Sequence, residues 1–510
     1  MDEYCDVLVV GSGGGALTGA YVAAREGLSV TVLEATDQFG GTTAYSGGGM
    51  WFPCNAVLRR AGDDDTIEVA RAYFRSVVGE RTPHELQDAF LDNGAPLIDY
   101  LETDSNLEFQ VLPWPDYFGS EKHARPQGRH IVPKPCSAKR LGSLRDALRV
   151  PLDAERGEQP PPDKLAGGQA LIGRLLTALS EQPGATLHRE APCTDLLVEG
   201  GAVVGASTTR GGKPVRIRAR RGVLLAAGGF ERNAELREQW GVPGDVAGTM
   251  GCPGNTGLAL RAALAAGAST DLMDQAWWAP GLTHPDGTST FSLLFSGGIF
   301  VDALGERFTN ESWPYDRIGR DVLAGIDEGT LHTPFWMIYD DRTGAIPPVG
   351  SASVPLAEPG AYEAAGLWHS AGSLSELAGR IGVPADALER TVARFNRMAA
   401  SGTDEDFHRG DEPYDRAFVE EGGSTLVPIE RAPYHAAAFG LSDLGTKGGL
   451  RTDGSARVLD AADQPIPGLY AAGNSMAAVS GTTYPAGGNP IGASMVFSYL
   501  AARDMAGTGR

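Results

Sequence analysis

Gly11-Ser12-Gly13-Gly14-Gly15-Ala16 lies between an apolar run, Cys5–Val10, and a segment with helical spacing, Ala16–Glu26. A second β-rich run, Ser29–Leu33, follows directly. Strand, glycine-rich turn, helix and strand together make a βαβ unit of about thirty residues. The sequence therefore predicts an α/β protein that begins with a Rossmann-like unit.

The residues of this turn have the features that a dinucleotide requires. Gly11 allows a tight turn, Gly13 lets the backbone approach a pyrophosphate, and Ala16 is small enough for the helix to pack on the sheet. Free N–H groups at the helix N-terminus favour phosphate. Glu34 ends the second strand and is followed by Ala35, so its carboxylate can accept hydrogen bonds from ribose hydroxyls. We expect these residues to bind a dinucleotide.

Three further segments indicate which dinucleotide is bound. They are Gly40–Gly48, Ala226–Phe230 and Gly468–Asn474. In this order along the chain they resemble the cofactor loops of two-domain flavoproteins, and a second fingerprint typical of NAD is missing. FAD is therefore expected, and it should be non-covalent because no histidine precedes His84. The expected contacts in these segments, and in the C-terminal helix, are Gly41, Thr42, Thr43, Ser46, Gly47, Gly48, Ala227, Gly228, Gly473, Asn474 and Ile491.

The bulk composition excludes several classes of function. The chain has 510 residues and a formal net charge of −21, which argues against nucleic-acid binding. Its five cysteines are scattered without a C-x-x-C pair, so no metal site is expected. No apolar run reaches the length of a membrane span, and no secretory segment precedes the first strand. We expect a cytoplasmic protein, with peripheral membrane association left open.

The pattern along the chain predicts two domains. Helices are expected in 61–110 and over Gly168–Ser180, Pro384–Met398 and Ile491–Met505, while 111–165 has the composition of a loop. Arg216–Ala219 is expected to lead into the apolar strand Gly222–Ala226. The composition changes near residue 276. We expect a Rossmann-like FAD-binding domain built from both chain ends, 1–275 and 446–510, with an inserted α+β catalytic domain, 276–445.

The inserted segment carries a more specific resemblance. Gly297–Asp302 and Gly305–Glu311 are similar to the fumarate reductase and succinate dehydrogenase flavoprotein superfamily. Such enzymes interconvert C–C single and double bonds beside a carbonyl, which acidifies the neighbouring C–H while flavin takes a hydride. A dicarboxylate enzyme needs an Arg and His clamp. The corresponding segments here carry tyrosines and apolar residues.

Nearly the whole chain resembles the 3-ketosteroid Δ1-dehydrogenases. The matches include Val9–Leu17, Phe39–Thr42 and Asn310–Asp316, and the specific ones are Leu441–Leu450 and Ser480–Phe497. This resemblance implies FAD-dependent 1,2-desaturation of a 3-ketosteroid. It also implies an external electron acceptor, for which a quinone is one candidate.

The resemblance assigns a role to four residues. Tyr484 O–H and the Gly488 N–H would donate to the C3 carbonyl oxygen, as in an oxyanion hole. Tyr315 would accept the proton from C2, and hydride from C1 would pass to flavin N5. Tyr117 would hydrogen-bond Tyr315 and ease its ionisation, since a free tyrosine has a pKa of about 10. A purely conformational role in the turn is the alternative for Gly488.

Other interpretations stay open at this point. A 3-ketosteroid Δ4-dehydrogenase acts on the other side of the same ketone, and a catalytically silent flavin-binding protein belongs to another class. Leu258 stands where the superfamily often has Asp, and the middle of Tyr484–Pro490 departs from the commoner motif. Trp277 and Trp278 fit an apolar pocket and core packing equally well.

Overall fold

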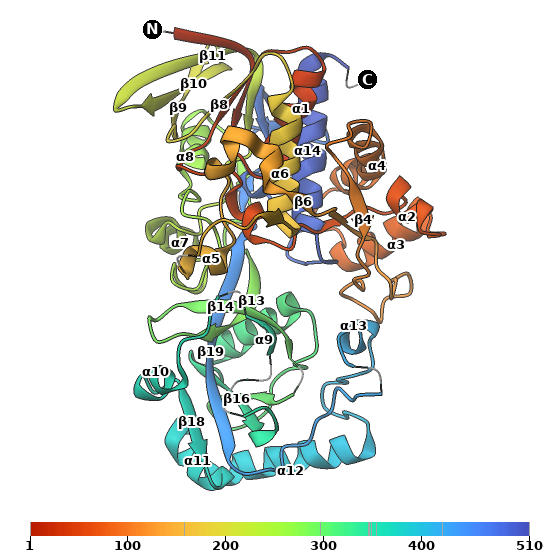
Figure 1. Ribbon diagram of the computed structural model, residues 1–510, viewed down its shortest axis with the longest axis vertical. Helices are drawn as coiled ribbons and strands as arrows, with labels where there is room; N and C mark the ends of the chain where they lie inside the picture. The colour runs from red at the N-terminus through yellow and green to blue at the C-terminus, as the bar shows by residue number, and fades with distance from the viewer. Residues whose placement is uncertain are drawn as a thin grey trace.

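The computed structural model describes residues 2–508, apart from 158, 296, 345, 346, 348, 353 and 421. It has a mixed α/β fold with two main sheets, and both chain termini lie at the upper end of the molecule in Figure 1. Within the described residues, none of the helices combines the length and the apolar character needed to cross a bilayer.

Eight strands form the first sheet, counted over the described residues. Its main path has the order β21-β22-β11-β1-β2-β8, in which β22 through β8 run parallel, and β10 and β9 extend antiparallel from β11. The strands are β1 (Asp2–Val10), β2 (Val30–Leu33), β8 (Ala185–His188), β9 (Cys193–Glu199), β10 (Ala202–Arg210), β11 (Lys213–Leu225), β21 (Arg457–Leu459) and β22 (Pro465–Ala471).

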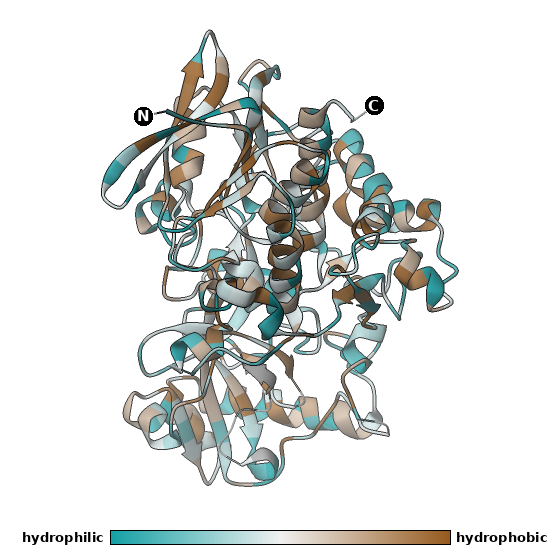
Figure 2. Ribbon diagram, turned by 45° about the horizontal axis from the view of Figure 1, so that its top comes forward, coloured by the Kyte–Doolittle hydropathy of each residue, from teal (hydrophilic) through white to brown (hydrophobic). Residues whose placement is uncertain are grey.

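Helices cover this sheet and complete the predicted βαβ unit. Val7–Val10 is buried throughout, as expected of a parallel strand with both faces covered. α1 (Gly14–Arg25) packs on α14 (Asn489–Ala506), and a Cβ on Gly15 would stand 2.1 Å from Ser494 Oγ. Only glycine permits this close approach. The central helices of Figure 2 are accordingly mostly brown and pale, whereas the outlying helices carry more teal.

The second sheet comprises seven strands among the described residues. Its longest strand is β19, which pairs antiparallel with β13, β16 and β18. The strands are β13 (Ala276–Thr283), β14 (Ser289–Phe295), β15 (Ile299–Val301), β16 (Phe335–Asp340), β17 (Val349–Ala352), β18 (Trp368–Ala371) and β19 (Tyr434–Thr446). All of them come from the segment between the two parts of the first sheet.

The remaining helices and small strands surround the two sheets (Figure 1). The helices are α2 (Ala56–Arg60), α3 (Ile67–Val78), α4 (His84–Leu101), α5 (Leu152–Arg156), α6 (Gly167–Ser180), α7 (Ala234–Trp240), α8 (Leu258–Ala265), α9 (Tyr315–Glu328), α10 (Pro359–Ala364), α11 (Leu374–Ile381), α12 (Ala385–Ser401) and α13 (Pro413–Arg416). The small strands are β3 (Met50–Trp51), β4 (Phe109–Val111), β5 (His130–Pro133), β6 (Cys136–Ser137), β7 (Lys164–Leu165), β12 (Thr270–Asp271) and β20 (Gly449–Leu450).

Arg216–Ala219 leads into Gly222–Leu225 within one strand, β11, which runs from Lys213 to Leu225 with a register shift against β1. One expectation about local structure was wrong. The segment 111–165 is not all loop, since it contains β5, whose partners β3 and β4 come from earlier in the chain. Pairing over such distances leaves no periodic signal in a short strand.

Candidate functional site

The turn between β1 and α1 brings its backbone up to the wall of a long cavity. Gly11 has a φ of +106°, and a Cβ there would stand 2.2 Å from the carbonyl oxygen of Ala226. Around Gly13 a Cβ would meet only Thr43 Oγ1, at 3.4 Å, and around Gly47 it would meet no atom within 4 Å. The glycine backbone is therefore open on the cavity side, as the close approach of a pyrophosphate requires.

Glu34 lies at the end of β2 with its carboxylate held in one orientation. Its Oε1 accepts hydrogen bonds from the Thr36 N–H and hydroxyl, both at 2.8 Å, and its Oε2 accepts one from the Ser12 hydroxyl. The residue is 6% exposed and lines the cavity together with Ala35. A fixed carboxylate beside the glycine turn fits the ribose of a dinucleotide.

The cavity has a volume of about 610 Å³ and runs between the two sheets. One end, which we call the cofactor end, is formed by Gly11–Gly15, Glu34, Thr42, Thr43 and Tyr45–Gly48. Of the residues that the sequence predicted for the site, all except Ala16 line this cavity. They are Gly11, Ser12, Gly13, Gly14, Gly15, Glu34, Ala35, Gly41, Thr42, Thr43, Ser46, Gly47, Gly48, Tyr117, Ala227, Gly228, Tyr315, Gly473, Asn474, Tyr484, Gly488 and Ile491. Ala16 is buried inside α1.

Three tyrosines from distant segments meet at the other end of the cavity, the tyrosine end. The ring centroids of Tyr117, Tyr315 and Tyr484 lie 5.2 to 5.7 Å apart in edge-to-face arrangements. Trp277 packs on Tyr484 at 4.9 Å, and Phe291 packs on Tyr315 at 4.7 Å. Trp277 thus belongs to the cavity, whereas Trp278 is buried in the core.

Burial dominates the electrostatics of this cluster. It raises the pKa of Tyr117, Tyr315 and Tyr484 above the ordinary value. Hydrogen bonding to the two neighbouring hydroxyls raises the pKa of Tyr315 further, while the Tyr315 hydroxyl and the Gly488 N–H act in the lowering direction on Tyr484. All three side chains are therefore phenols at neutral pH in the absence of a ligand.

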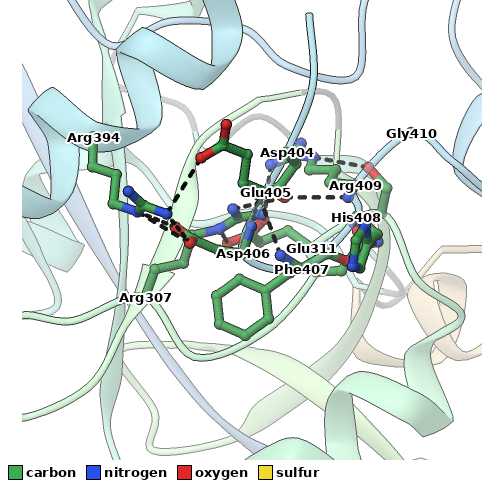
Figure 3. Close-up of polar contacts among 12 residues, drawn as sticks. Arg307, Glu311, Arg394, Asp404, Glu405, Asp406, Phe407, His408, Arg409 and Gly410 are labelled. Carbon is green, nitrogen blue, oxygen red and sulfur yellow. Dashed lines mark hydrogen bonds and ion pairs between the residues drawn. The ribbon is translucent and has the colours of Figure 1, made fainter.

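Buried ion pairs hold the loop that precedes Tyr315. The Glu311 carboxylate accepts two hydrogen bonds from Arg307, at 2.9 and 2.7 Å, and one from Arg409 at 2.9 Å (Figure 3). Arg307 also pairs with Asp404 at 2.8 Å. This network is closed and buried, and it ties the loop before α9 to the segment before α13. Tyr315 then begins α9, immediately after Pro314.

Backbone contacts hold the other two tyrosines. The Tyr117 N–H donates to the Pro485 carbonyl at 3.0 Å, and the Tyr73 hydroxyl donates to the same oxygen at 2.6 Å. Gly488 precedes α14 with a φ of +84°, and a Cβ there would stand 2.6 Å from the Gly49 carbonyl carbon. Gly488 is thus required by the turn, and its N–H lies close enough to the Tyr484 hydroxyl oxygen to hydrogen-bond it.

Several residues of this site had no recognised signal in the sequence. His130 lies against Gly49, where a Cβ would stand 1.8 Å from the ring, although 80 residues separate the two in the chain. Its Nδ1 faces the Leu112 carbonyl at 3.3 Å, and burial lowers its pKa to about 4. Tyr414, on α13, packs behind the tyrosine end at 5.2 Å from Tyr117. Only the fold brings His130 to the cavity wall and Tyr414 against the tyrosines.

The two departures from the superfamily pattern that the sequence shows lie beside the cavity. Leu258 begins α8 at the rim of the cofactor end and is 43% exposed. The middle of the C-terminal motif, Pro485–Gly487, contacts the loop that carries Tyr117: a Cβ on Gly487 would stand 2.8 Å from Trp114 Nε1. Leu258 and Gly487 line the cavity.

The geometry describes a long dinucleotide cavity whose far end is a buried group of tyrosines. A family model described as an FAD binding domain matches residues 6–491, so the dinucleotide is FAD. The 3-oxosteroid 1-dehydrogenase of Mycobacterium tuberculosis is 38% identical over 98% of each chain. The 4-oxocyclohexanecarboxylate 2-dehydrogenase of Sinomonas cyclohexanicum is 36% identical over 98% of this chain and 93% of that protein.

A solved structure has the same fold over its whole length. It is the 3-ketosteroid Δ1-dehydrogenase of Sterolibacterium denitrificans in complex with 1,4-androstadiene-3,17-dione, with a TM-score of 0.90, 32% identity, and coverage of 99% of this chain and 100% of that one. This chain belongs to the 3-oxosteroid 1-dehydrogenase family of flavin oxidoreductases.

Proposed function

We propose that this protein catalyses the 1,2-desaturation of 3-ketosteroids. The observation that carries the proposal is that Tyr117, Tyr315, Tyr484 and Gly488 line one end of the cavity whose other end fits FAD. The names of the relatives support the same reaction. Apolar side chains continue the wall beyond the tyrosines, as a tetracyclic hydrocarbon requires: Leu152, Met250, Phe291, Leu293 and Leu444.

In this proposal the ketone is activated by two donors. The Tyr484 hydroxyl and the Gly488 N–H donate to the C3 carbonyl oxygen and stabilise the enolate that develops there. Because the two donors stabilise the enolate, the C2 proton becomes more acidic, and its transfer to Tyr315 forms that enolate. Bound FAD supplies the acceptor for the hydride that leaves C1.

The raised pKa of Tyr315 makes the direction of one hydrogen bond important. When the Tyr315 hydroxyl donates to Tyr117, this hydrogen bond raises the pKa of Tyr315 and keeps its proton in place. A hydroxyl can rotate and exchange the donor and acceptor roles. For Tyr315 to act as a base, Tyr117 must donate to it, because a hydrogen bond to the phenolate stabilises the charged form.

The domain boundaries are part of the same proposal. We assign 1–275 and 446–510 to a Rossmann-like FAD-binding domain and 276–445 to an inserted catalytic domain. The sheet memberships support this division, because β13 begins at Ala276 and β19 ends at Thr446. An external electron acceptor, for which a quinone is a candidate, would then reoxidise the flavin.

The test is anaerobic mixing of the yellow protein with 4-androstene-3,17-dione while the flavin absorbance is followed. Bleaching with release of the 1,4-diene supports the proposal, and Tyr484→Phe should slow it by about 100-fold or more with FAD still bound. Bleaching only by a saturated 5α-3-ketosteroid, with a 4-ene product, would replace it with Δ4-dehydrogenation. Bleaching only by 4-oxocyclohexanecarboxylate would replace the steroid with a monocyclic keto acid. No bleaching with any ketone would leave a silent flavoprotein.

A further inference from the structure

A single buried ammonium touches three parts of the tyrosine end. Lys447 lies just after β19 and is 0% exposed. Its Nζ donates to the carbonyl oxygens of Thr482 and Thr483, at 3.0 and 2.9 Å. It lies 3.6 Å from Asp316 Oδ1 and 4.3 Å from the ring centroid of Trp277. Two of the three N–H donors of the ammonium are therefore hydrogen-bonded, and the contact with Asp316 is an ion pair beyond hydrogen-bonding distance.

Each partner of Lys447 is adjacent to a residue of the proposed mechanism. Thr483 directly precedes Tyr484, and Asp316 directly follows Tyr315. Trp277 packs against the Tyr484 ring, and its Nε1 donates to Asn474 at 3.2 Å. The ammonium is therefore bonded to the supports of both tyrosines, although it does not itself line the cavity.

A buried charge at this place is energetically expensive. Burial lowers the pKa of Lys447 to about 7, Asp316 opposes that change, and Arg320 adds to it. Replacing a buried ion pair with apolar side chains is often neutral or stabilising, so stability alone gives no reason for a lysine here. The contacts of Lys447 indicate instead that it holds the groups around it in one geometry.

We propose that Lys447 is a positioning residue of the reaction, which fixes the Thr482–Thr483 turn and the Trp277 ring so that the Tyr484 hydroxyl faces the ketone oxygen. This inference rests on the proposed function, and Lys447 acts through Tyr484. A hydroxyl that is displaced by about 1 Å stabilises the enolate less, although the steroid still enters the cavity. The defect should therefore fall on the chemical step and leave binding of the steroid unchanged.

The variant Lys447→Met keeps the length of the side chain and removes the ammonium. The rate of flavin reduction at saturating 4-androstene-3,17-dione should fall roughly 10- to 100-fold, while KM stays within about threefold. The same substitution in a Tyr484→Phe background should change the rate by less than about threefold, since the residues act as one unit. Multiplicative effects of the two substitutions, or a wild-type rate in Lys447→Met, would overturn the proposal.

A control and a second readout separate this inference from the proposed function. Arg320 pairs with Asp316 from the other side, at 2.9 Å, but is not bonded to Thr482 or Thr483, so Arg320→Gln should change the rate less than about threefold. Hydrogen exchange of the amides in 482–488 should accelerate at least about 10-fold in Lys447→Met and remain unchanged in Arg320→Gln. If the wild-type protein oxidises no steroid, the proposed function fails. The hydrogen-exchange measurement does not depend on turnover, so unchanged exchange in Lys447→Met would refute the positioning role on its own. If Lys447→Met does not fold, Lys447→Gln takes its place in the same measurements.

Discussion

The two ends of the cavity are built in different ways. The cofactor end consists mainly of backbone, presented by glycines of consecutive elements within the first 50 residues. The tyrosine end consists of side chains, and its three tyrosines come from a loop, from the start of α9 and from the turn before α14. Substitutions at the cofactor end should therefore act on whether FAD is bound, and substitutions at the tyrosine end on what the bound FAD can do.

The largest effect is expected from a methyl group at the cofactor end. Gly11→Ala places a Cβ 2.2 Å from backbone that cannot move aside, so the purified protein should contain no FAD. Flavin absorbance per polypeptide measures this directly. Gly27→Ala is the matched control, because Gly27 has a φ of +85° and open space around it. Full FAD content in Gly11→Ala would contradict the conclusion that the backbone of the cofactor end decides whether FAD binds.

The second prediction concerns the tyrosine end. Tyr315→Phe removes the proposed base without leaving a void, so flavin reduction by 4-androstene-3,17-dione should slow by roughly 10²- to 10⁴-fold with FAD content unchanged. Stopped-flow absorbance gives the rate. Tyr499→Phe, on α14 away from the cavity, should leave it within about twofold. Loss of FAD from Tyr315→Phe would contradict the claim that the tyrosine end affects turnover and not FAD binding.

A smaller effect is expected from the Glu34 carboxylate. Glu34→Gln keeps one carbonyl oxygen for Ser12 or Thr36 but loses the charge that strengthens a hydrogen bond to a ribose hydroxyl. The Kd for FAD should rise about 10-fold, and the rate per bound FAD should stay near that of wild type. Titration of the apoprotein with FAD, monitored by fluorescence, tests this. The exposed Glu199→Gln variant should bind FAD as wild type does.

The last effect changes neither FAD content nor turnover: it is a pH dependence of stability. His130 is neutral in the folded protein, because burial lowers its pKa from 6.5 to about 4. As pH falls from 6.5, the unfolded chain binds a proton that the folded chain does not, so the free energy of unfolding should decrease by about 2 kcal/mol at pH 5. Thermal unfolding at fixed FAD concentration should show a smaller decrease in His130→Gln and an unchanged one in the exposed His332→Gln. Equal acid sensitivity in all three proteins would show that His130 titrates freely.

The same contrast explains how far the sequence could predict the structure. The βαβ unit through Glu34 is confirmed, because turn, helix and strand carry their signals locally. α6, α12 and α14 are confirmed close to their expected bounds for the same reason. The assignment to the 3-oxosteroid dehydrogenase family is also confirmed. The expected roles of Tyr117, Tyr315, Tyr484 and Gly488 stay predictions.

Residues that reach the site through tertiary pairing were not predictable in this way. β5 brings His130 to Gly49 only because it pairs with β3 and β4, and two-residue strands such as β3 have no sequence pattern. Tyr414 sits on the four-residue helix α13, next to the buried Asp415, whose carboxylate accepts a hydrogen bond from Asn310, 105 residues away. Lys447 lies inside the segment Leu441–Leu450, but a sequence motif does not reveal which of its side chains will be buried.

The position of β22 has a consequence for the biosynthesis of this protein. β22 lies between β21 and β11, and the segment after it supplies Gly473, Asn474, Tyr484 and Gly488 to the cavity. The ribosome has to synthesise the chain beyond Gly488 before the wall of the cavity can close. The glycine turn is synthesised first, but the cavity is incomplete until β22 has joined the sheet. FAD should therefore bind late in maturation. A nascent chain stalled before residue 465 should contain no bound FAD.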